Sequence, residues 1–227
     1  MAECRKHQAE HGSKTGCVLV EPYPYIVKYG DPETLASYIE TRSFLWNSEQ
    51  QTKKPRIPKL IHQFRVGNGQ GTAYAVLEHI KPVQSPDDLD KRIEDAVTWL
   101  SGVQAPSDHK LGPLGGGCIR HVFFESVEAP LPFVSVKALQ RYIDKLCVQY
   151  LYFLAHPSSI IMKPGTGAQK ASIQRGRRRW RHAHGGTARS VCVQATMDAS
   201  HFGVDEEDNT ILMGLGNISF LPETFAR

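Results

Sequence analysis

The stretch ATMDASHFGVD, residues 195–205, is followed after five residues by ILMGLG, residues 211–216. Between the two lies an acidic segment with an asparagine, residues 205–209, which is typical of a tight turn between two short strands. We therefore predict a polar loop, then a short hairpin, then a loop containing glycines. This stretch decides the interpretation of the whole chain.

Several segments before it carry signals of regular structure. β-branched and aromatic residues predict a strand at 25–29, and Asp31-Pro32-Glu33 predicts the start of a helix. The helix continues with side chains three and four positions apart. They are Leu35, Tyr38, Ile39, Arg42, Leu45 and Trp46. Residues 60–66 and 72–79 predict two strands joined by a glycine-rich turn, and so a hairpin.

The second half of the chain has a helical character. Residues 85–89 predict the cap of one helix, and a long amphipathic helix starts near Ser135. A β-rich first third followed by helices predicts an α+β fold with two lobes that join near residues 81–82. The expected division is a flexible N-terminal segment 1–22, a β-rich lobe 23–81 and a partial helical lobe 82–227.

Positive charge is concentrated in one segment. No acid occurs between Asp144 and Asp198, whereas nine lysines and arginines do, and without them the net charge of +4 becomes −5. Residues 157–190 have no apolar period and are expected to form a basic insert of low order. Three interpretations stay open: inserted or read-through sequence, a plain loop, or a surface that binds nucleic acid through the arginines of 175–181 and Trp180. Nucleic acid is not the partner that we expect.

Composition limits the class of protein. With 227 residues, of which 41% are hydrophobic, the chain can bury a core. It has no run of about 18 apolar residues that could span a membrane, and no apolar leader typical of secretion. The five cysteines are scattered, which favours a reducing compartment over disulfides or zinc. We expect an intracellular protein, cytoplasmic or nuclear, without a metal site.

The order of these elements resembles the protein-kinase-like superfamily, and most of all the fungal kinase-like proteins grouped near the aminoglycoside phosphotransferases. The resemblance runs over residues 23–227, with a break at the basic insert. It implies that Lys28 is the strand lysine that holds the phosphates of ATP, and that Glu40 is the helix glutamate paired with it. The hinge strand, which binds the adenine edge in such proteins, corresponds to Leu77, Glu78 and His79.

The same resemblance places three losses in the catalytic machinery. The catalytic-loop aspartate falls on Thr196, the metal-binding asparagine on His201 and the metal-loop aspartate on Gly214. Threonine does not accept a proton at neutral pH, and magnesium prefers oxygen ligands that glycine lacks, so neither phosphoryl transfer nor bound magnesium is expected. Asp198 is the candidate substitute for the lost acid, although a loop-capping role is favoured. Asp205 is expected to start the turn.

Residues 12–16 match neither the kinase glycine-rich loop nor the P-loop, and a flexible turn is expected there. The resemblance also implies an incomplete large lobe, whose apolar surface a protein partner would cover. The leading hypothesis is a degenerate kinase-like protein without phosphotransferase activity that binds ATP weakly through Lys28, Glu40 and the hinge. The alternatives are an active phosphotransferase that uses Asp198 and Asp205 in altered roles, and a basic module that binds nucleic acid through 175–181.

Overall fold

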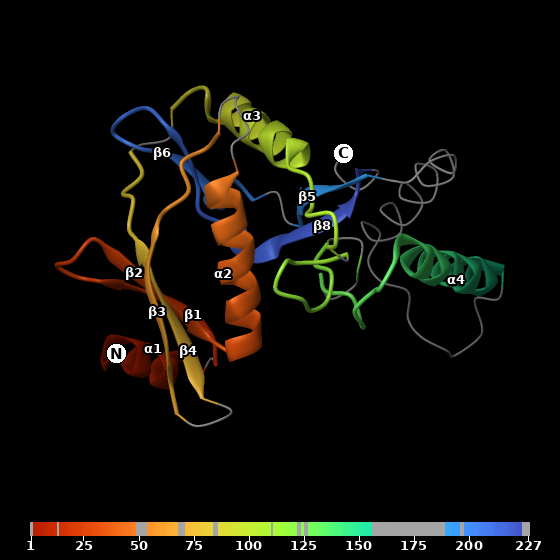
Figure 1. Ribbon diagram of the computed structural model, residues 1–227, viewed down its shortest axis with the longest axis horizontal. Coiled ribbons are helices and arrows are strands. Elements are labelled where there is room, and N and C mark those ends of the chain that lie inside the picture. Colours follow the sequence, from red (N-terminus) through yellow and green to blue (C-terminus); the bar gives the residue numbers. More distant parts are fainter. Residues whose placement is uncertain are drawn as a thin grey trace. The chain divides into compact units, whose positions relative to one another are not determined.

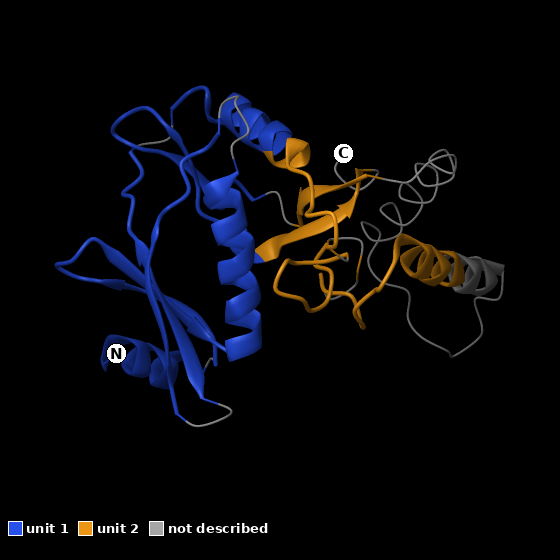
Figure 2. Cartoon of the chain, viewed as in Figure 1, with its two compact units in different colours: residues 1–99, 197–216 blue, residues 100–196, 217–227 orange. Residues whose placement is uncertain are grey.

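A computed structural model describes most of the chain (Figure 1). The described residues are 2–12, 14–48, 54–67, 71–83, 86–109, 111–121, 124, 127–155, 189–195 and 198–223. They fall into two compact units, one built from 1–99 and 197–216 and the other from 100–196 and 217–227 (Figure 2). The fold is mixed α+β, as predicted.

The first unit is built on a four-stranded antiparallel sheet. Its strands are β1 (Gly16–Val20), β2 (Tyr25–Gly30), β3 (Leu60–Val66) and β4 (Thr72–Glu78), in the order β1-β2-β4-β3. The predicted strands and the β3–β4 hairpin are confirmed. Lys28 stands between Cys17 of β1 and Ala75 of β4, so these three side chains share one face of the sheet.

The helix α2 (Pro32–Asn47) follows β2 directly. It begins as the sequence predicts, because the Asp31 side chain accepts hydrogen bonds from the backbone N–H groups of Glu33 and Thr34, each at 3.0 Å. Pro32 occupies the first turn, where its missing N–H costs nothing. Of the predicted stripe, Leu35, Tyr38, Arg42 and Leu45 are buried, whereas Ile39 is partly exposed and Trp46 is 44% exposed.

The helix α1 (Ala2–His11) packs on the face of the sheet opposite to the one that carries Lys28. Its Cys4 is 1% exposed and belongs to a buried cluster with Val27, Tyr29 and Tyr74. His7 Nδ1 and the Tyr29 hydroxyl are joined by a hydrogen bond of 2.9 Å. Residues 1–22, expected to be a flexible segment, therefore contain α1 and β1. The sequence did not predict α1 because its remaining side chains give no apolar stripe.

The C-terminal stretch 198–217 belongs, except for Asn217, to the first unit as well. It contains the 3₁₀ turn η1 (Ala199–His201), the strands β6 (Phe202–Val204) and β7 (Thr210–Leu212), and the turn η2 (Leu215–Asn217). The predicted hairpin around 205–209 is confirmed. The segment after β4 contacts this hairpin, because the Val83 N–H donates a hydrogen bond to the Val204 carbonyl at 2.8 Å.

Most of the helix α3 (Leu89–Gly102) belongs to the first unit. Ser85, where its predicted cap begins, lies outside the described residues, so that cap stays a prediction. The second unit contains α4 (Val136–Ala155) and an antiparallel pair, β5 (Ser190–Gln194) and β8 (Ile218–Pro222). Ile119, Leu139 and Phe220 are fully buried in it. None of the helices in the described part of the chain is both long and apolar enough to cross a membrane.

The two units group the residues differently from the expected division at 81–82. Most of α3 and residues 197–216 cluster with the β-rich part of the chain. The roles of 23–81 and 82–227 as lobes stay a prediction. Of the basic insert 157–190, only Arg189 and Ser190 are described, so the arginines of 175–181 and Trp180 lie outside the described residues.

Candidate functional site

Lys28 lies between α2 and the glycine-containing loop after β7. Its ammonium Nζ stands 3.9 Å from the centroid of the Tyr38 ring, a cation–π arrangement. A Cβ built on Gly216 would lie 3.2 Å from the same Nζ, so the lysine also lies close to that loop. Strand lysine, helix and glycine loop, which the resemblance links, are therefore brought together within one unit.

Glu40 does not face Lys28. It is exposed, and the ion pairs of the described residues do not include it. The reason is helical phase: Glu40 follows Tyr38 by two positions, roughly 200° around the helix axis. Since Tyr38 faces the lysine, Glu40 must point away. Where a carboxylate was expected beside Lys28, the structure has an aromatic ring.

Arg42 backs this ring one helical turn further on. It is only 2% exposed, and its Nη1 donates to the Tyr38 hydroxyl at 3.1 Å. Its Nη2 is buried without a hydrogen-bond partner, and the described ion pairs do not include Arg42. Burial lowers the pKa of the guanidinium, and the interactions with Tyr38 and with the Glu78 carboxylate partly oppose this. Sequence reasoning placed Arg42 on the helix stripe but gave it no role at the site.

The residues expected to form the hinge already make hydrogen bonds within the fold. Leu77 is buried within the β4 ladder. The Glu78 carboxylate accepts bonds from Arg56 at 2.8 Å and from the Lys59 N–H at 2.9 Å. The backbone N–H groups of Glu78 and His79 donate to the carbonyls of Lys59 and Pro24, each at 2.8 Å. These two donors are therefore not open to an adenine edge, and whether the hinge binds a base stays a prediction.

The positions that correspond to the catalytic and metal loops lie around η1. Thr196 falls outside the described residues. The Asp198 side chain caps η1 by accepting the Ser200 N–H at 2.9 Å, and this hydrogen bond holds the pKa of the exposed carboxyl below its usual value. Asp198 therefore performs the capping role that was favoured. As a weakened base it is a poor substitute for the lost aspartate.

His201 and Gly214 fit each other. A Cβ at Gly214 would overlap the His201 ring, and the His201 carbonyl accepts the Met213 N–H at 2.8 Å. The ring thus fills the space where a side chain at 214 would stand. Magnesium needs several oxygen ligands in octahedral geometry. Within the described residues, no group of three or more His, Cys, Asp or Glu side chains is placed to hold a metal ion. Gly214 has no side chain and the His201 ring fills its place, so these two positions supply no side-chain oxygen for magnesium.

The side chain of Asp205 holds the β6–β7 turn together through hydrogen bonds. It is 4% exposed, and its two oxygens accept four hydrogen bonds, from the Glu207 N–H, the Asn209 N–H and side chain, and Arg56. Although burial raises the pKa of Asp205, the bonds from Arg56 and Asn209 outweigh it and hold the pKa below its ordinary value. Arg56 also pairs with Glu78 and so links the β6–β7 turn to the sheet. Sequence reasoning missed Arg56, which carries no local signal.

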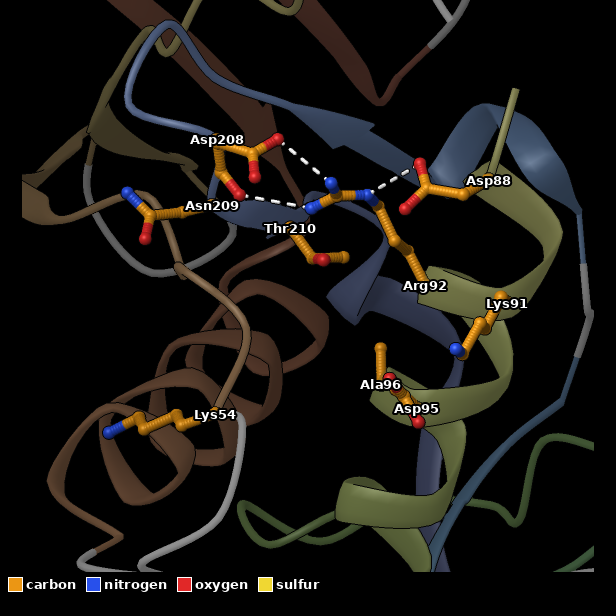
Figure 3. Close-up of a pocket in the computed structure, with 9 residues that line it drawn as sticks. All are labelled: Lys54, Asp88, Lys91, Arg92, Asp95, Ala96, Asp208, Asn209 and Thr210. Atoms are coloured by element: carbon orange, nitrogen blue, oxygen red, sulfur yellow. Dashed lines mark hydrogen bonds and ion pairs between the residues drawn. The ribbon is translucent and has the colours of Figure 1, made fainter. Parts of the chain in front are cut away.

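A pocket of about 400 Å³ lies elsewhere on this unit (Figure 3). Its lining residues are Lys54, Asp88, Lys91, Arg92, Asp95, Ala96, Asp208, Asn209 and Thr210. Figure 3 shows Arg92 between Asp88 and Asp208, and it pairs with both at 2.8 Å. The ion pairs tie α3 to the β6–β7 turn, so the charge of Arg92 in this pocket is balanced without a ligand.

Comparison with family models gives no match, and comparison with curated proteins also gives none. Solved structures do match. A GDP complex of a mutant aminoglycoside 2'-phosphotransferase IIIa matches with a TM-score of 0.52 and 11% identity over 94% of this chain, which spans 66% of that one. The aminoglycoside phosphotransferase APH(4)-Ia matches with a TM-score of 0.52 and 12% identity, over 98% of this chain and 73% of that one.

A ternary complex of a thermostable mutant of APH(4)-Ia with AMP-PNP and hygromycin B matches with a TM-score of 0.51 and 10% identity. At such low identity the likeness concerns the fold alone. The chain has the fold of the kinase-like phosphotransferases.

Proposed function

We propose that the chain is a degenerate kinase-like protein that binds a nucleotide at Lys28 and does not transfer its phosphoryl group. One observation carries the proposal: Lys28 stands beside the loop of Gly214 and Gly216, while the His201 ring occupies the space of the missing acid. The lysine that would hold phosphates is thus retained, and the group that would hold the metal is replaced by packing.

The sheet offers a surface for the base as well. Strand alternation puts Leu19 and Ile26 on the face that carries Lys28. Leu19 is 44% exposed, and Ile26 is partly exposed. Apolar side chains next to a cation suit a ligand with an apolar ring and a charged tail. The matching structures with GDP or AMP-PNP are complexes of this kind, which supports a nucleotide as the ligand.

The hinge would then take part through later residues than Glu78 and His79. The next backbone N–H groups are those of Ile80 and Lys81, from which no backbone carbonyl of the described residues accepts a hydrogen bond. Leu77 would contribute to the floor of the site and Glu40 would play no part in it. The alternatives, an enzyme that relies on Asp198 and a module that binds nucleic acid through 175–181, stay predictions.

Thermal unfolding with and without ATP tests the proposal. A ligand at about five times its Kd stabilises the folded state by roughly 1 kcal/mol. For a chain of this size, that raises the midpoint by about 2–4 °C. We expect the rise to disappear in Lys28→Ala and to persist in Lys6→Ala, which removes an exposed lysine from α1 on the other face of the sheet.

Two outcomes would count against the proposal. A cooperative thermal transition whose midpoint does not change at millimolar ATP would show that the protein does not bind the nucleotide. ATP-dependent phosphoryl transfer that is lost in Lys28→Ala would show that the protein is an active phosphotransferase, and so contradict the proposal. If transfer were instead lost in Asp198→Asn with the fold intact, the alternative enzyme would be supported.

A further inference from the structure

Two positive side chains gather around one ring next to the glycine loop. Lys28 Nζ is 3.9 Å and Arg42 Cζ is 6.0 Å from the centroid of Tyr38. Arg42 is bound to the ring's hydroxyl, so its guanidinium is fixed in place. The ring is 8% exposed, so both cations lie next to a side chain that is largely withdrawn from water. Both charges therefore act on the same small region with little screening.

Arg42 is the unusual member of this group. A buried guanidinium normally has a carboxylate partner, because taking the charge out of water is costly. Here the Nη1 group has a neutral hydroxyl as partner and the buried Nη2 group has no hydrogen-bond partner. The Glu78 carboxylate attracts Arg42 electrostatically, but the ion pairs of the described residues do not join the two. The folded chain thus carries a positive charge whose electrostatic balance among the described residues is incomplete. An anion bound beside Lys28 would supply that balance.

The position that corresponds to the metal-binding aspartate, Gly214, has no negative side chain to bind a cation. In kinase-like sites the metal ions neutralise charge on the transferring phosphate. In this chain Gly214 has no side-chain ligand, and restoring an acid there would also require the His201 ring to move. Positive charge comes instead from a second fixed side chain, which needs no metal ligands.

We propose that this site binds the phosphate groups of a nucleotide without a divalent cation, with Lys28 as the direct contact and buried Arg42 as a fixed second charge. This inference rests on the proposed function, because it assumes that Lys28 contacts the nucleotide. The inference extends the proposed function in two ways. It names the form of the ligand, which is a polyphosphate without a metal ion, and it names Arg42 as the residue that replaces the metal.

Isothermal titration with ATP, once in excess EDTA and once in excess magnesium chloride, tests the inference on the wild-type chain. Magnesium lowers the negative charge of ATP, and this site has no ligands to use the metal. We therefore expect affinity in EDTA to equal or exceed affinity in magnesium, by up to roughly tenfold. Binding that appears only with magnesium would overturn the inference and leave the proposed function standing.

Variants then assign the second charge. Arg42→Met keeps the length of the side chain and removes a buried unpaired charge, so we expect it to fold. In EDTA it should weaken ATP binding roughly tenfold, as suits a charge that acts without direct contact, and Arg42→Lys should recover part of the loss. Arg5→Met on α1 is the matched control and should bind as the wild type does.

The outcomes separate the two proposals. Unchanged affinity for Arg42→Met in EDTA would remove Arg42 from the site. Absence of binding in both buffers by a folded wild-type chain would instead overturn the proposed function. If Arg42→Met did not unfold cooperatively, the comparison of EDTA with magnesium on the wild type would still decide the metal question.

Discussion

One added methyl group at Gly214 tests the fit between this glycine and His201. A Cβ there would overlap the Cβ, Cγ and Cδ2 atoms of the His201 side chain. The backbone does not itself require glycine, because Gly214 is absent from the described residues with positive φ. The Met213 and Gly214 N–H groups both donate to the His201 carbonyl, at 2.8 and 3.3 Å. These bonds hold the two segments together, so the overlap cannot be relieved by a small separation.

The expected cost of Gly214→Ala follows from this overlap. Inserting a methyl group into a well-packed site costs about 1–3 kcal/mol. For a chain of this length, each kcal/mol lowers the midpoint by about 2–4 °C. Gly216→Ala is the matched control, since its nearest neighbour at 3.2 Å is the end of the flexible Lys28 side chain, which can move aside. It should cost clearly less.

Urea unfolding of four proteins measures the coupling: wild type, Gly214→Ala, His201→Ala and the double variant. Without the His201 ring, Gly214→Ala should cost little, so the coupling energy should be about 1–2 kcal/mol. The reasoning fails if Gly214→Ala costs no more than Gly216→Ala, or if its cost is the same with and without the His201 ring. Either result would mean that another group fills the space.

Three further substitutions test the framework around the site. Asp205→Asn should lower the free energy of unfolding by about 2–4 kcal/mol at pH 7. This loss should shrink as the pH falls below 3.8, the ordinary pKa of an aspartate, because a carboxyl with a lowered pKa in the folded state stabilises the fold only while it is ionised. An equal effect of Glu206→Gln in urea unfolding would contradict this. Tyr29→Phe removes the bond to His7, so hydrogen exchange in α1 should speed up severalfold, and unchanged exchange would show that the bond does not hold the helix. Gly203→Ala places a Cβ 3.0 Å from the Pro82 Cβ and should lower the thermal midpoint by a few degrees; an unchanged midpoint would show that the hinge segment moves freely.

Local signals explain which elements could be predicted from the sequence. Asp31 and Pro32 fix the start of α2 through hydrogen bonds to the next few residues. The acidic turn at 205–209 closes on Asp205 itself, again within five residues. By contrast, α1 buries only Cys4, so no periodic pattern identifies it. Arg56 and Asp205 are 149 positions apart and have no shared motif.

The choice of Glu40 as the partner of Lys28 shows where a motif misleads. Matching an acid on the helix considers residue type and order, whereas contact depends on helical phase. The buried stripe contains Tyr38 and Arg42, and Glu40 falls outside it. The period was visible in the sequence, so phase alone could have placed Tyr38 opposite the lysine. The missing partner of Arg42 Nη2 could not have been found in this way, since it depends on three-dimensional packing.

Arg42 connects the stability of the fold to the binding of its ligand, and the two effects should have opposite signs. Without ligand, the buried unpaired guanidinium costs free energy, so Arg42→Met should leave stability unchanged or raise it by up to about 2 kcal/mol. With ATP in EDTA, the same variant should gain less from the ligand, because its Kd is weaker. Unfolding midpoints measured with and without ATP compare both effects in one protein. A residue that only packs would lower the stability without ligand and leave the ligand-induced rise unchanged, and that result would contradict the role proposed for Arg42.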